Sequence, residues 1–206
     1  MVFPRKGNMS GGWIDKMYEI ILASGSYKRK EILQKAGISF RVVVPDIDER
    51  LFDTLPVKER VQKIARAKAR KVAEQFPESV IIAADTMDEN EKQFVNHKPK
   101  NLEEELKMAM EYSGSGSICY TGVCLIHPKF GEVVEVAETK IKMQSFSKEE
   151  LEKLVDDKFL LRAGALGISE ETAGFTLTES VSGSYTGPFG LPMEIVRKYL
   201  KKWKLI

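Results

Sequence analysis

The residues best placed for chemistry in this sequence lie where an apolar stretch, Tyr18–Ala23, runs through Ser24 and Ser26 into a basic segment with Lys28 and Arg29. Small residues between an apolar stretch and a helix leave backbone N–H groups free at the helix N-terminus, and these groups, with the two cations, favour an anion such as phosphate. The same residues also fit an ordinary strand–turn–helix in which Ser26 caps the helix and the cations are solvated. The local pattern leaves both interpretations open.

A carboxylate follows a second apolar stretch. Asp85 comes directly after Val80–Ala84, so we expect it at the carboxyl end of a buried strand, where open α/β sheets place their ligands. An aspartate that caps the next turn would give the same pattern. The sequence by itself therefore makes Asp85 a candidate and no more.

Two further charged features have ordinary explanations as well. The acidic segment with Asp46, Asp48 and Glu49 follows the predicted strand Phe40–Val44, and such loops are commonly solvated surface, with metal binding the less common alternative. Lys68 lies among alanines on a predicted helix, where a surface lysine is the simplest interpretation. Neither feature identifies a site alone.

Strands and helices alternate along the first half of the chain and would position these residues. We expect strands at Tyr18–Ala23, Phe40–Val44 and Val80–Ala84, and helices at Lys28–Lys35 and Val57–Glu74. This alternation predicts an α/β protein.

The second half predicts an antiparallel strand pair between helices. Capping-box patterns predict helices that start near Asn101 and Ser147 and run through Tyr112 and Val155. The remaining expected elements are long strands at Ser117–Ile126 and Val133–Met143 and a closing amphipathic helix at Pro192–Trp203. The sheet should therefore be mixed. Residues 1–16 lack periodicity and are expected to be a tail, with residues 17–206 forming a single domain.

Composition limits the partners. Lys and Arg exceed Asp and Glu by only 2 charges, so a small anionic ligand is favoured and nucleic-acid binding is not expected. Cys119 and Cys124 lack a metal-ligand spacing, with only His97 and His127 as further soft ligands, which predicts buried, reduced thiols. No apolar run is long enough to span a bilayer, and the opening residues lack the apolar core of a secretion signal, so we expect no membrane partner and a cytoplasmic protein.

Many short blocks occur in a familiar order. They are Leu22-Ala23-Ser24-Gly25-Ser26, Asp48-Glu49, Ala83-Ala84-Asp85-Thr86, Lys98-Pro99, Ser113-Gly114, Tyr120-Thr121-Gly122, Ala163-Gly164, Gly183-Ser184-Tyr185 and Gly190-Leu191-Pro192. From about Met17 to its end, the chain resembles the Maf family of nucleoside triphosphate pyrophosphatases.

The resemblance implies a fold and a reaction. The fold is the Maf and inosine triphosphate pyrophosphatase-like arrangement, a mixed twisted sheet flanked by helices, with two lobes around a central cleft. The reaction is hydrolysis of a nucleoside triphosphate to the monophosphate and pyrophosphate, on thymidine or uridine triphosphates or on modified nucleotides. A divalent metal, Mg²⁺ or Mn²⁺, and a homodimer are implied as well.

The resemblance also implies residue roles. Asp85 becomes the general base or a metal ligand, Glu49 the second metal ligand, and Lys68 and Lys98 cations on the phosphates, so that the implied catalytic residues are Asp85, Lys68 and Lys98. The implied substrate-binding residues are Ser24, Ser26, Lys28, Arg29, Arg162 and Ser169.

Four positions depart from the family pattern and put the base preference in doubt. Arg162 stands where lysine is usual, Ser169 where pyrimidine-preferring members have glutamine, Lys28 where arginine is common, and Ser117 where histidine is frequent. A serine cannot offer the paired donor and acceptor of a glutamine amide, so we expect Ser169 to relax or shift base selectivity without changing the reaction.

Two other functions compete with this interpretation. One is an inosine triphosphate pyrophosphatase-like purine hydrolase, which a substrate panel would distinguish. The other is a non-catalytic regulatory protein that senses nucleotides or binds nucleic acid, since Maf proteins have a historical link to septum formation in cell division. The presence of Asp85, Glu49, Lys68 and Lys98 argues against a degenerate sensor.

Overall fold

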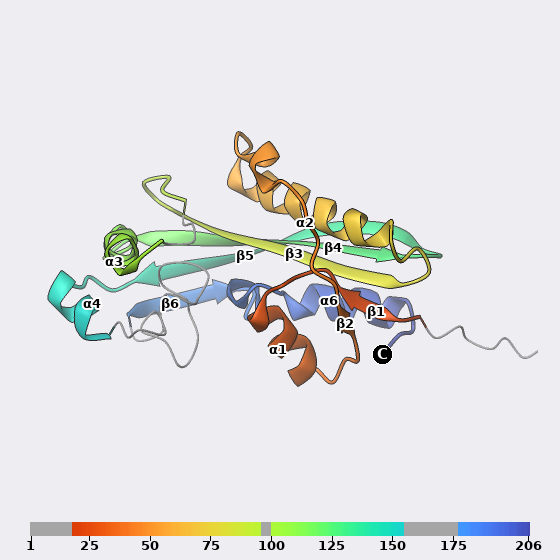
Figure 1. Cartoon of the computed structure of the whole chain (residues 1–206). Helices are drawn as coiled ribbons and strands as arrows, with labels where there is room; N and C mark the ends of the chain where they lie inside the picture. The colour runs from red at the N-terminus through yellow and green to blue at the C-terminus, as the bar shows by residue number, and fades with distance from the viewer. Residues whose placement is uncertain (1–17, 96–99, 155–176) are drawn as a thin grey trace, which may run out of the picture.

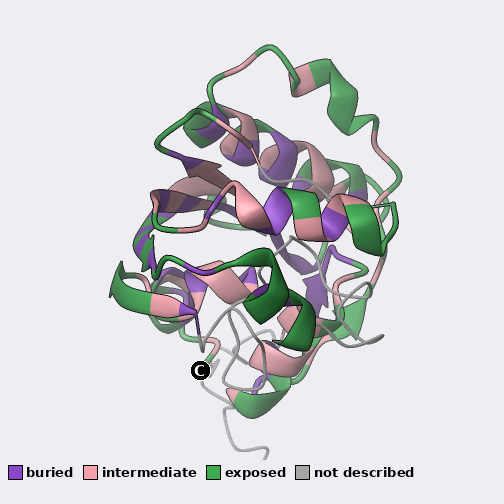
Figure 2. Cartoon of the chain, turned by 90° about the vertical axis from the view of Figure 1, so that its left-hand side faces the viewer, coloured by how far each residue is buried: buried purple, intermediate pink, exposed green. Residues whose placement is uncertain are grey.

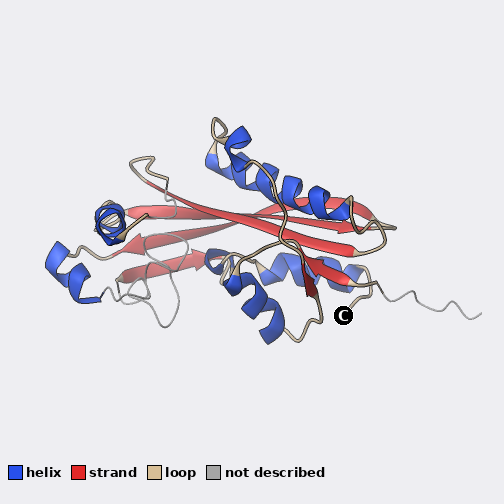
Figure 3. Ribbon diagram, viewed as in Figure 1, coloured by secondary structure: helices blue, strands red, loops and turns tan. Residues whose placement is uncertain are grey.

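One six-stranded sheet organises the protein, with its strands in the order β2-β1-β3-β4-β5-β6 (Figures 1 and 3). The computed structural model describes residues 18–95, 100–154 and 177–206, so Lys98, Arg162, Ser169 and the expected tail lie outside the described residues. The strands are β1 Ile20–Leu22, β2 Arg41–Val42, β3 Val80–Asn90, β4 Gly116–His127, β5 Gly131–Met143 and β6 Thr178–Gly183. Because β2, β1 and β3 are parallel and the other pairs antiparallel, the predicted mixed sheet is confirmed.

Strand β3 corrects one expectation. It does not end before Asp85 but continues to Asn90, because β4 keeps pairing with it through Asp85–Gly122 as far as Asn90–Ser117. On its other edge, the last partners are Leu22 and Ile82, after which β1 ends. Asp85 therefore lies inside a long strand, just beyond the point where its parallel neighbour stops.

Helices cover both faces of the sheet. They are α1 Tyr27–Lys35, α2 Val57–Ala73, α3 Leu102–Met110, α4 Lys148–Leu154 and α6 Met193–Lys202, with short 3₁₀ helices η1 Glu49–Phe52 and η3 Gly187–Phe189. Figure 1 shows α2 on one side of the sheet and α1 and α6 on the other. Buried residues gather on the sheet and on the sides of the helices that face it (Figure 2).

Both predicted caps form. Asn101 accepts a hydrogen bond from the Glu104 N–H at 2.9 Å and caps α3. At α4, Ser147 and Glu150 exchange two hydrogen bonds, the reciprocal pattern of a complete capping box. Helix α3 ends at Met110, two residues before the predicted end, and the predicted last residue of α4 lies outside the described part of the chain.

Period-two alternation along the strands separates two cores. On one face, Ile81, Ala83 and Cys124 pack with Ala65 and Ala69 of α2. On the other face, a larger cluster joins alternate residues of β1, β3 and β4 to Leu33 of α1 and to the apolar side of α6, including Val196 and Leu200.

A third cluster lies toward the far ends of β4 and β5, where Cys119, Ile141 and Met143 pack with residues of α3 and α4. Both cysteines are buried and free, as predicted. The division into two lobes around a cleft stays a prediction. None of the described helices combines the length and apolar character that crossing a membrane requires.

Gly122 on β4 sets how closely α2 lies on the sheet. A Cβ at this position would come within 2.4 Å of the Val61 carbonyl oxygen, so the helix backbone rests directly on the glycine. The close approach brings α2 down onto the stretch of sheet that contains Asp85, which is the partner of Gly122 on β3.

Candidate active site

Two adjacent residues of β3 form the middle of the site and point to opposite faces of the sheet. Asp85 shares the alternation of Ile81 and Ala83 and faces α2, whereas Thr86 faces the side of α1. Because β1 has already ended, side chains from both faces reach this edge of β3. The site therefore combines groups from α1, α2 and the loop after β2.

Lys68 comes from the α2 face. Its Nζ lies 2.7 Å from Asp85 Oδ1 and 2.8 Å from Glu49 Oε1, and its side chain is only 12% exposed. The alanines around it allow α2 to pack against the sheet, and the long lysine side chain extends past that contact to β3. Lys68 is thus an interior ammonium between two carboxylates and not a surface lysine.

Glu49 opens η1, and its neighbour Asp48 is engaged elsewhere. Asp48 caps η1 by accepting from the Arg50 N–H at 3.2 Å and also pairs with the Arg50 guanidinium. The two neighbouring acidic residues therefore have different roles. Glu49 contacts Lys68, whereas Asp48 stabilises the turn that positions Glu49.

Asp85 is held in an unusual electrostatic setting. Its Oδ2 is buried and has no hydrogen-bond partner among the described residues, while Oδ1 accepts from Lys68. Burial raises the pKa of the Asp85 carboxyl above its usual range, and the positive charges of Lys68 and Arg29 only partly oppose that shift. A buried carboxylate with a free oxygen and a raised pKa is suited to accept a proton or bind a cation.

Arg29 enters from the opposite face and holds three segments together. Its Nε donates to the Gly190 carbonyl at 2.8 Å, Nη1 to Ser24 Oγ at 3.0 Å, and Nη2 to Thr86 Oγ1 at 3.4 Å. Burial lowers the pKa of Arg29, while Asp85 and Glu49 act to raise it. A guanidinium remains charged under these conditions, so Arg29 is a fixed cation beside Asp85.

Gly190 and Thr121 complete the Arg29 side of the site. Gly190 has a φ of 98°, and a Cβ there would approach Arg29 Nε to 3.1 Å, so glycine is needed for both conformation and space. Thr86 Oγ1 lies 3.1 Å from Thr121 Oγ1, which donates to the Gly187 carbonyl. The sequence does not predict that Thr86, Thr121 and Gly190 support Arg29, although all three lie in the short blocks that resemble the Maf family.

The two serines shape the turn before α1. Ser26 caps the helix by accepting from the Arg29 N–H at 3.4 Å, and Ser24 Oγ accepts from the Ser26 N–H at 3.2 Å. The capping interpretation of Ser26 is confirmed. The described contacts of Lys28 place its ammonium 3.2 Å from Glu31, within α1, and its predicted contact with substrate stays a prediction.

The donors present fit a hard divalent cation. Asp85 and Glu49 both turn carboxylate oxygens toward the same ammonium, and Asp85 keeps a second, buried oxygen. No cluster of three or more His, Cys, Asp or Glu with metal-binding geometry occurs in the described ranges. A cation held by these two carboxylates would take its remaining ligands from phosphate oxygens and water. This arrangement is typical of Mg²⁺ bound together with a phosphorylated substrate.

Fold and site together define an α/β protein with a charged site at the edge of a mixed sheet. The fold is similar to that of the Ham1 protein of Staphylococcus aureus, with a TM-score of 0.52 and 13% identity over 89% of this chain and 98% of that one. The chain belongs to the Maf family, because the family model described as Maf-like protein matches residues 19–203.

Two bacterial proteins are similar to this chain over nearly their full length. A protein of Acetivibrio thermocellus named dTTP/UTP pyrophosphatase is 34% identical over 90% of this chain and 95% of its own. A Geobacillus protein of the same name is 32% identical over 90% of this chain and 98% of its own. Both similarities cover the part of the chain that carries Arg29, Glu49, Lys68 and Asp85.

Proposed function

We propose that this protein is a nucleoside triphosphate pyrophosphatase that releases pyrophosphate from dTTP and UTP. The observation that carries the proposal is the placement of two partly buried cations, Lys68 and Arg29, on opposite faces of the sheet beside Asp85, just beyond the end of β1. Phosphoryl transfer needs positive charge around the phosphorus more than it needs acid–base groups. The names of the similar proteins agree with this chemistry.

The triphosphate binds between the turn before α1 and the edge of β3. The N–H groups of the first turn of α1 that Ser26 does not cap and the Arg29 guanidinium hold its oxygens, and Lys68 neutralises charge from the α2 face. Asp85 Oδ2 accepts the proton of the attacking water, the water oxygen bonds to the α-phosphorus, and the bond from the α-phosphorus to the oxygen that bridges it to the β-phosphorus breaks. Pyrophosphate leaves with that electron pair.

The raised pKa of Asp85 makes its carboxylate a stronger base than a solvated aspartate. A divalent cation, Mg²⁺ or Mn²⁺, would be held by Asp85 and Glu49, where it would neutralise the phosphates and lower the pKa of water. Lys98 completes the proposed catalytic set, while Arg162, Ser169 and Lys28 complete the proposed substrate contacts. A homodimer is proposed for the assembled enzyme.

A substrate panel tests the proposal. The wild-type protein with Mg²⁺ is incubated with canonical, methylated and deaminated nucleoside triphosphates, and phosphate is measured by malachite green with and without added inorganic pyrophosphatase. Signal that appears only with the added enzyme is the expected result. Orthophosphate without it would indicate a phosphatase, and no product with any nucleotide would favour a non-catalytic regulatory protein.

A further inference from the structure

Lys68 contacts the same two carboxylates that would hold the divalent cation. Its Nζ lies 2.7 Å from Asp85 Oδ1 and 2.8 Å from Glu49 Oε1. A metal ion bonded to these oxygens would lie within a few ångströms of the ammonium, and two cations so close together repel strongly in a mostly buried site. Lys68 in this position and a divalent cation therefore compete for the same carboxylate oxygens.

The three side chains differ in how far they can move. Asp85 is fixed on β3 and its side chain is 9% exposed, whereas the side chain of Glu49, on the short helix η1, is 47% exposed. Lys68 carries its ammonium on a flexible four-carbon stem. The ammonium can therefore leave the two carboxylates on the open side of the site, where Glu49 lies, while Asp85 stays in place.

The charges of the site balance within the protein. The carboxylates of Asp85 and Glu49 are matched by the two cations Lys68 and Arg29. A divalent cation added alone would leave a mostly buried site with excess positive charge, which is unfavourable. A triphosphate reverses this, because it adds negative charge and offers the Lys68 ammonium new oxygen partners.

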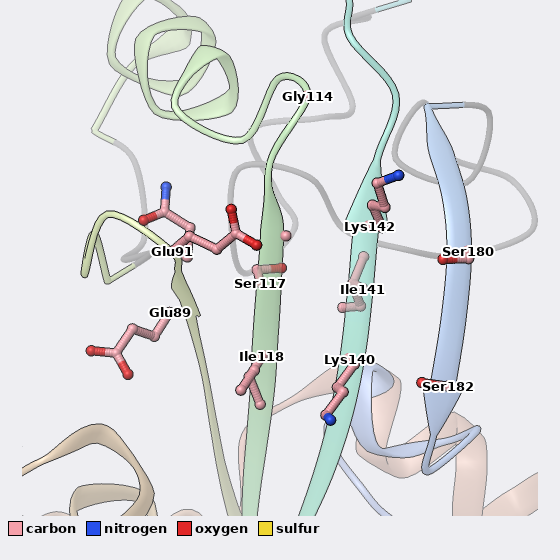
Figure 4. Close-up of a pocket in the computed structure, with 12 residues that line it drawn as sticks. Glu89, Glu91, Gly114, Ser117, Ile118, Lys140, Ile141, Lys142, Ser180 and Ser182 are labelled. Carbon is pink, nitrogen blue, oxygen red and sulfur yellow. The ribbon is translucent and has the colours of Figure 1, made fainter.

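The glutamates of a polar pocket at the far ends of β3 to β6 provide a contrast. The pocket has a volume of about 480 Å³ and is lined by Glu89 and Glu91 together with Lys140 and Lys142. The carboxylates of Glu89 and Glu91 point in different directions (Figure 4), so they do not converge on one cation. Convergence of two carboxylates on one ammonium distinguishes the Lys68 site from this pocket.

We propose that Lys68 is an internal counter-cation that pairs with Asp85 and Glu49 until a nucleotide draws its ammonium onto the phosphates. The divalent cation then binds well only together with the nucleotide. This inference rests on the proposed pyrophosphatase function and assigns the order in which its components assemble. Because coupling between two ligands is reciprocal, the cation should also raise the affinity for the nucleotide.

Binding of Mn²⁺, followed by the electron paramagnetic resonance signal of the free ion, tests the proposal. The protein is titrated with and without a UTP analogue that has an uncleavable imido group between its α and β phosphates. A titration without protein gives the Mn²⁺ held by the analogue alone. The wild type should bind Mn²⁺ at least about tenfold more tightly with the analogue than without it.

Lys68→Met should reverse this dependence. Without nucleotide, the variant should bind Mn²⁺ at least about tenfold more tightly than the wild type, because the competing ammonium is gone. The gain from adding the analogue should become smaller, because the phosphates lose a partner. Lys68→Arg keeps a cation at the position, so its Mn²⁺ binding without nucleotide should stay weak.

Two kinds of control separate this effect from general charge and from other carboxylates. Lys71→Met removes the same charge from an exposed position on the same helix and should bind Mn²⁺ like the wild type. In the Lys68→Met background, Glu49→Gln should abolish the gained affinity, whereas Glu91→Gln in the polar pocket should leave it unchanged. Circular dichroism checks the fold of each variant.

Equal Mn²⁺ affinity of Lys68→Met and wild type without nucleotide would overturn the proposal. So would a wild type that binds Mn²⁺ as tightly without the analogue as with it, a measurement that needs no substitution and holds even where Lys68→Met does not fold. Failure of the proposed function is separate, because it shows as no pyrophosphate release by the wild type from any nucleotide.

Discussion

The Lys68 ammonium lies 2.7 Å from Asp85 Oδ1, and this contact opposes the effect of burial on the Asp85 carboxyl. Burial raises the pKa of Asp85, and the positive charge of Lys68 pulls it back toward its usual range. In the proposed mechanism, Lys68 therefore lowers the pH above which Asp85 can act as the base.

Lys68→Met is therefore expected to move the acidic limb of the pH profile of kcat/KM to higher pH, in addition to lowering the maximum rate. The sign follows because removal of a cation removes a contribution that lowers the Asp85 pKa. The profile is measured with UTP at saturating Mg²⁺. Lys63→Met, an exposed lysine on the same helix, should leave the limb in place, and an unmoved limb in Lys68→Met would refute the assignment of that limb to Asp85.

Asp85→Asn should reduce kcat by on the order of a hundredfold or more, because it removes the proposed proton acceptor and metal ligand while keeping the side-chain shape. Turnover is measured by pyrophosphate release, and circular dichroism checks that the fold is retained. Near-normal turnover at saturating Mg²⁺ would show that Asp85 is not the base.

The same variant should show that the ionised Asp85 carboxylate lowers the free energy of unfolding. The folded-state pKa of Asp85 is raised above its ordinary value of 3.8, so between these two values the native state binds more protons than the unfolded state. The unfolding free energy of the wild type should therefore fall, relative to Asp85→Asn, as pH rises through that window, and then level off. Urea unfolding across a pH series measures the difference, and a difference independent of pH would contradict the raised pKa.

Arg29→Lys should lower both stability and activity, although the substitution keeps the positive charge. A lysine ammonium cannot reach Ser24, Thr86 and Gly190 in the fixed geometry of the guanidinium, so acceptors on three segments lose their donor. We expect a loss of about 1–3 kcal/mol in unfolding free energy and at least about tenfold in kcat/KM. Lys30→Met, on the exposed side of α1, serves as the control, and wild-type values for both quantities in Arg29→Lys would disprove the bridging role.

Gly122→Ala should destabilise the protein by about 1–3 kcal/mol, because the added methyl group meets the Val61 backbone carbonyl, which cannot rotate away. Gly25→Ala is the matched comparison, since its Cβ would meet only Val44 side-chain atoms at 3.5 Å, an ordinary contact. Chemical denaturation of both variants provides the measurement. Equal stabilities would mean that α2 can lift from the sheet without cost.

The sequence predicts those elements whose formation depends on residues that are close together in the chain. The caps at Asn101 and Ser147 are predictable because each needs only a side-chain oxygen and the N–H three residues later. The edge strand β6 was missed because Thr178–Gly183 is polar and almost entirely exposed, so it has no apolar alternation to detect. Its existence depends on pairing with β5, which is a tertiary property.

The site shows the same division between local and long-range information. The position of Arg29 at the start of α1 could be inferred from the turn before it, but its bond to Gly190 joins residues 161 positions apart. The end of β3 was placed too early because Asp85 interrupts the apolar run, whereas pairing with β4 continues for five more residues. The candidate site lies where β3 becomes polar. The sequence pattern of a strand is therefore weakest in the part of β3 that carries the candidate catalytic residues.

Adjacent positions on β3 send Asp85 to α2 and Thr86 to α1, and this makes the length of the strand as important as its composition. Deleting or inserting one residue between Val80 and Asp85 would exchange the two faces, leaving a carboxylate toward Arg29 and a hydroxyl toward Lys68. The apolar residues of β3 tolerate substitution by others of similar volume. Their number cannot change, so this short stretch acts as a fixed spacer between the core and the reacting groups.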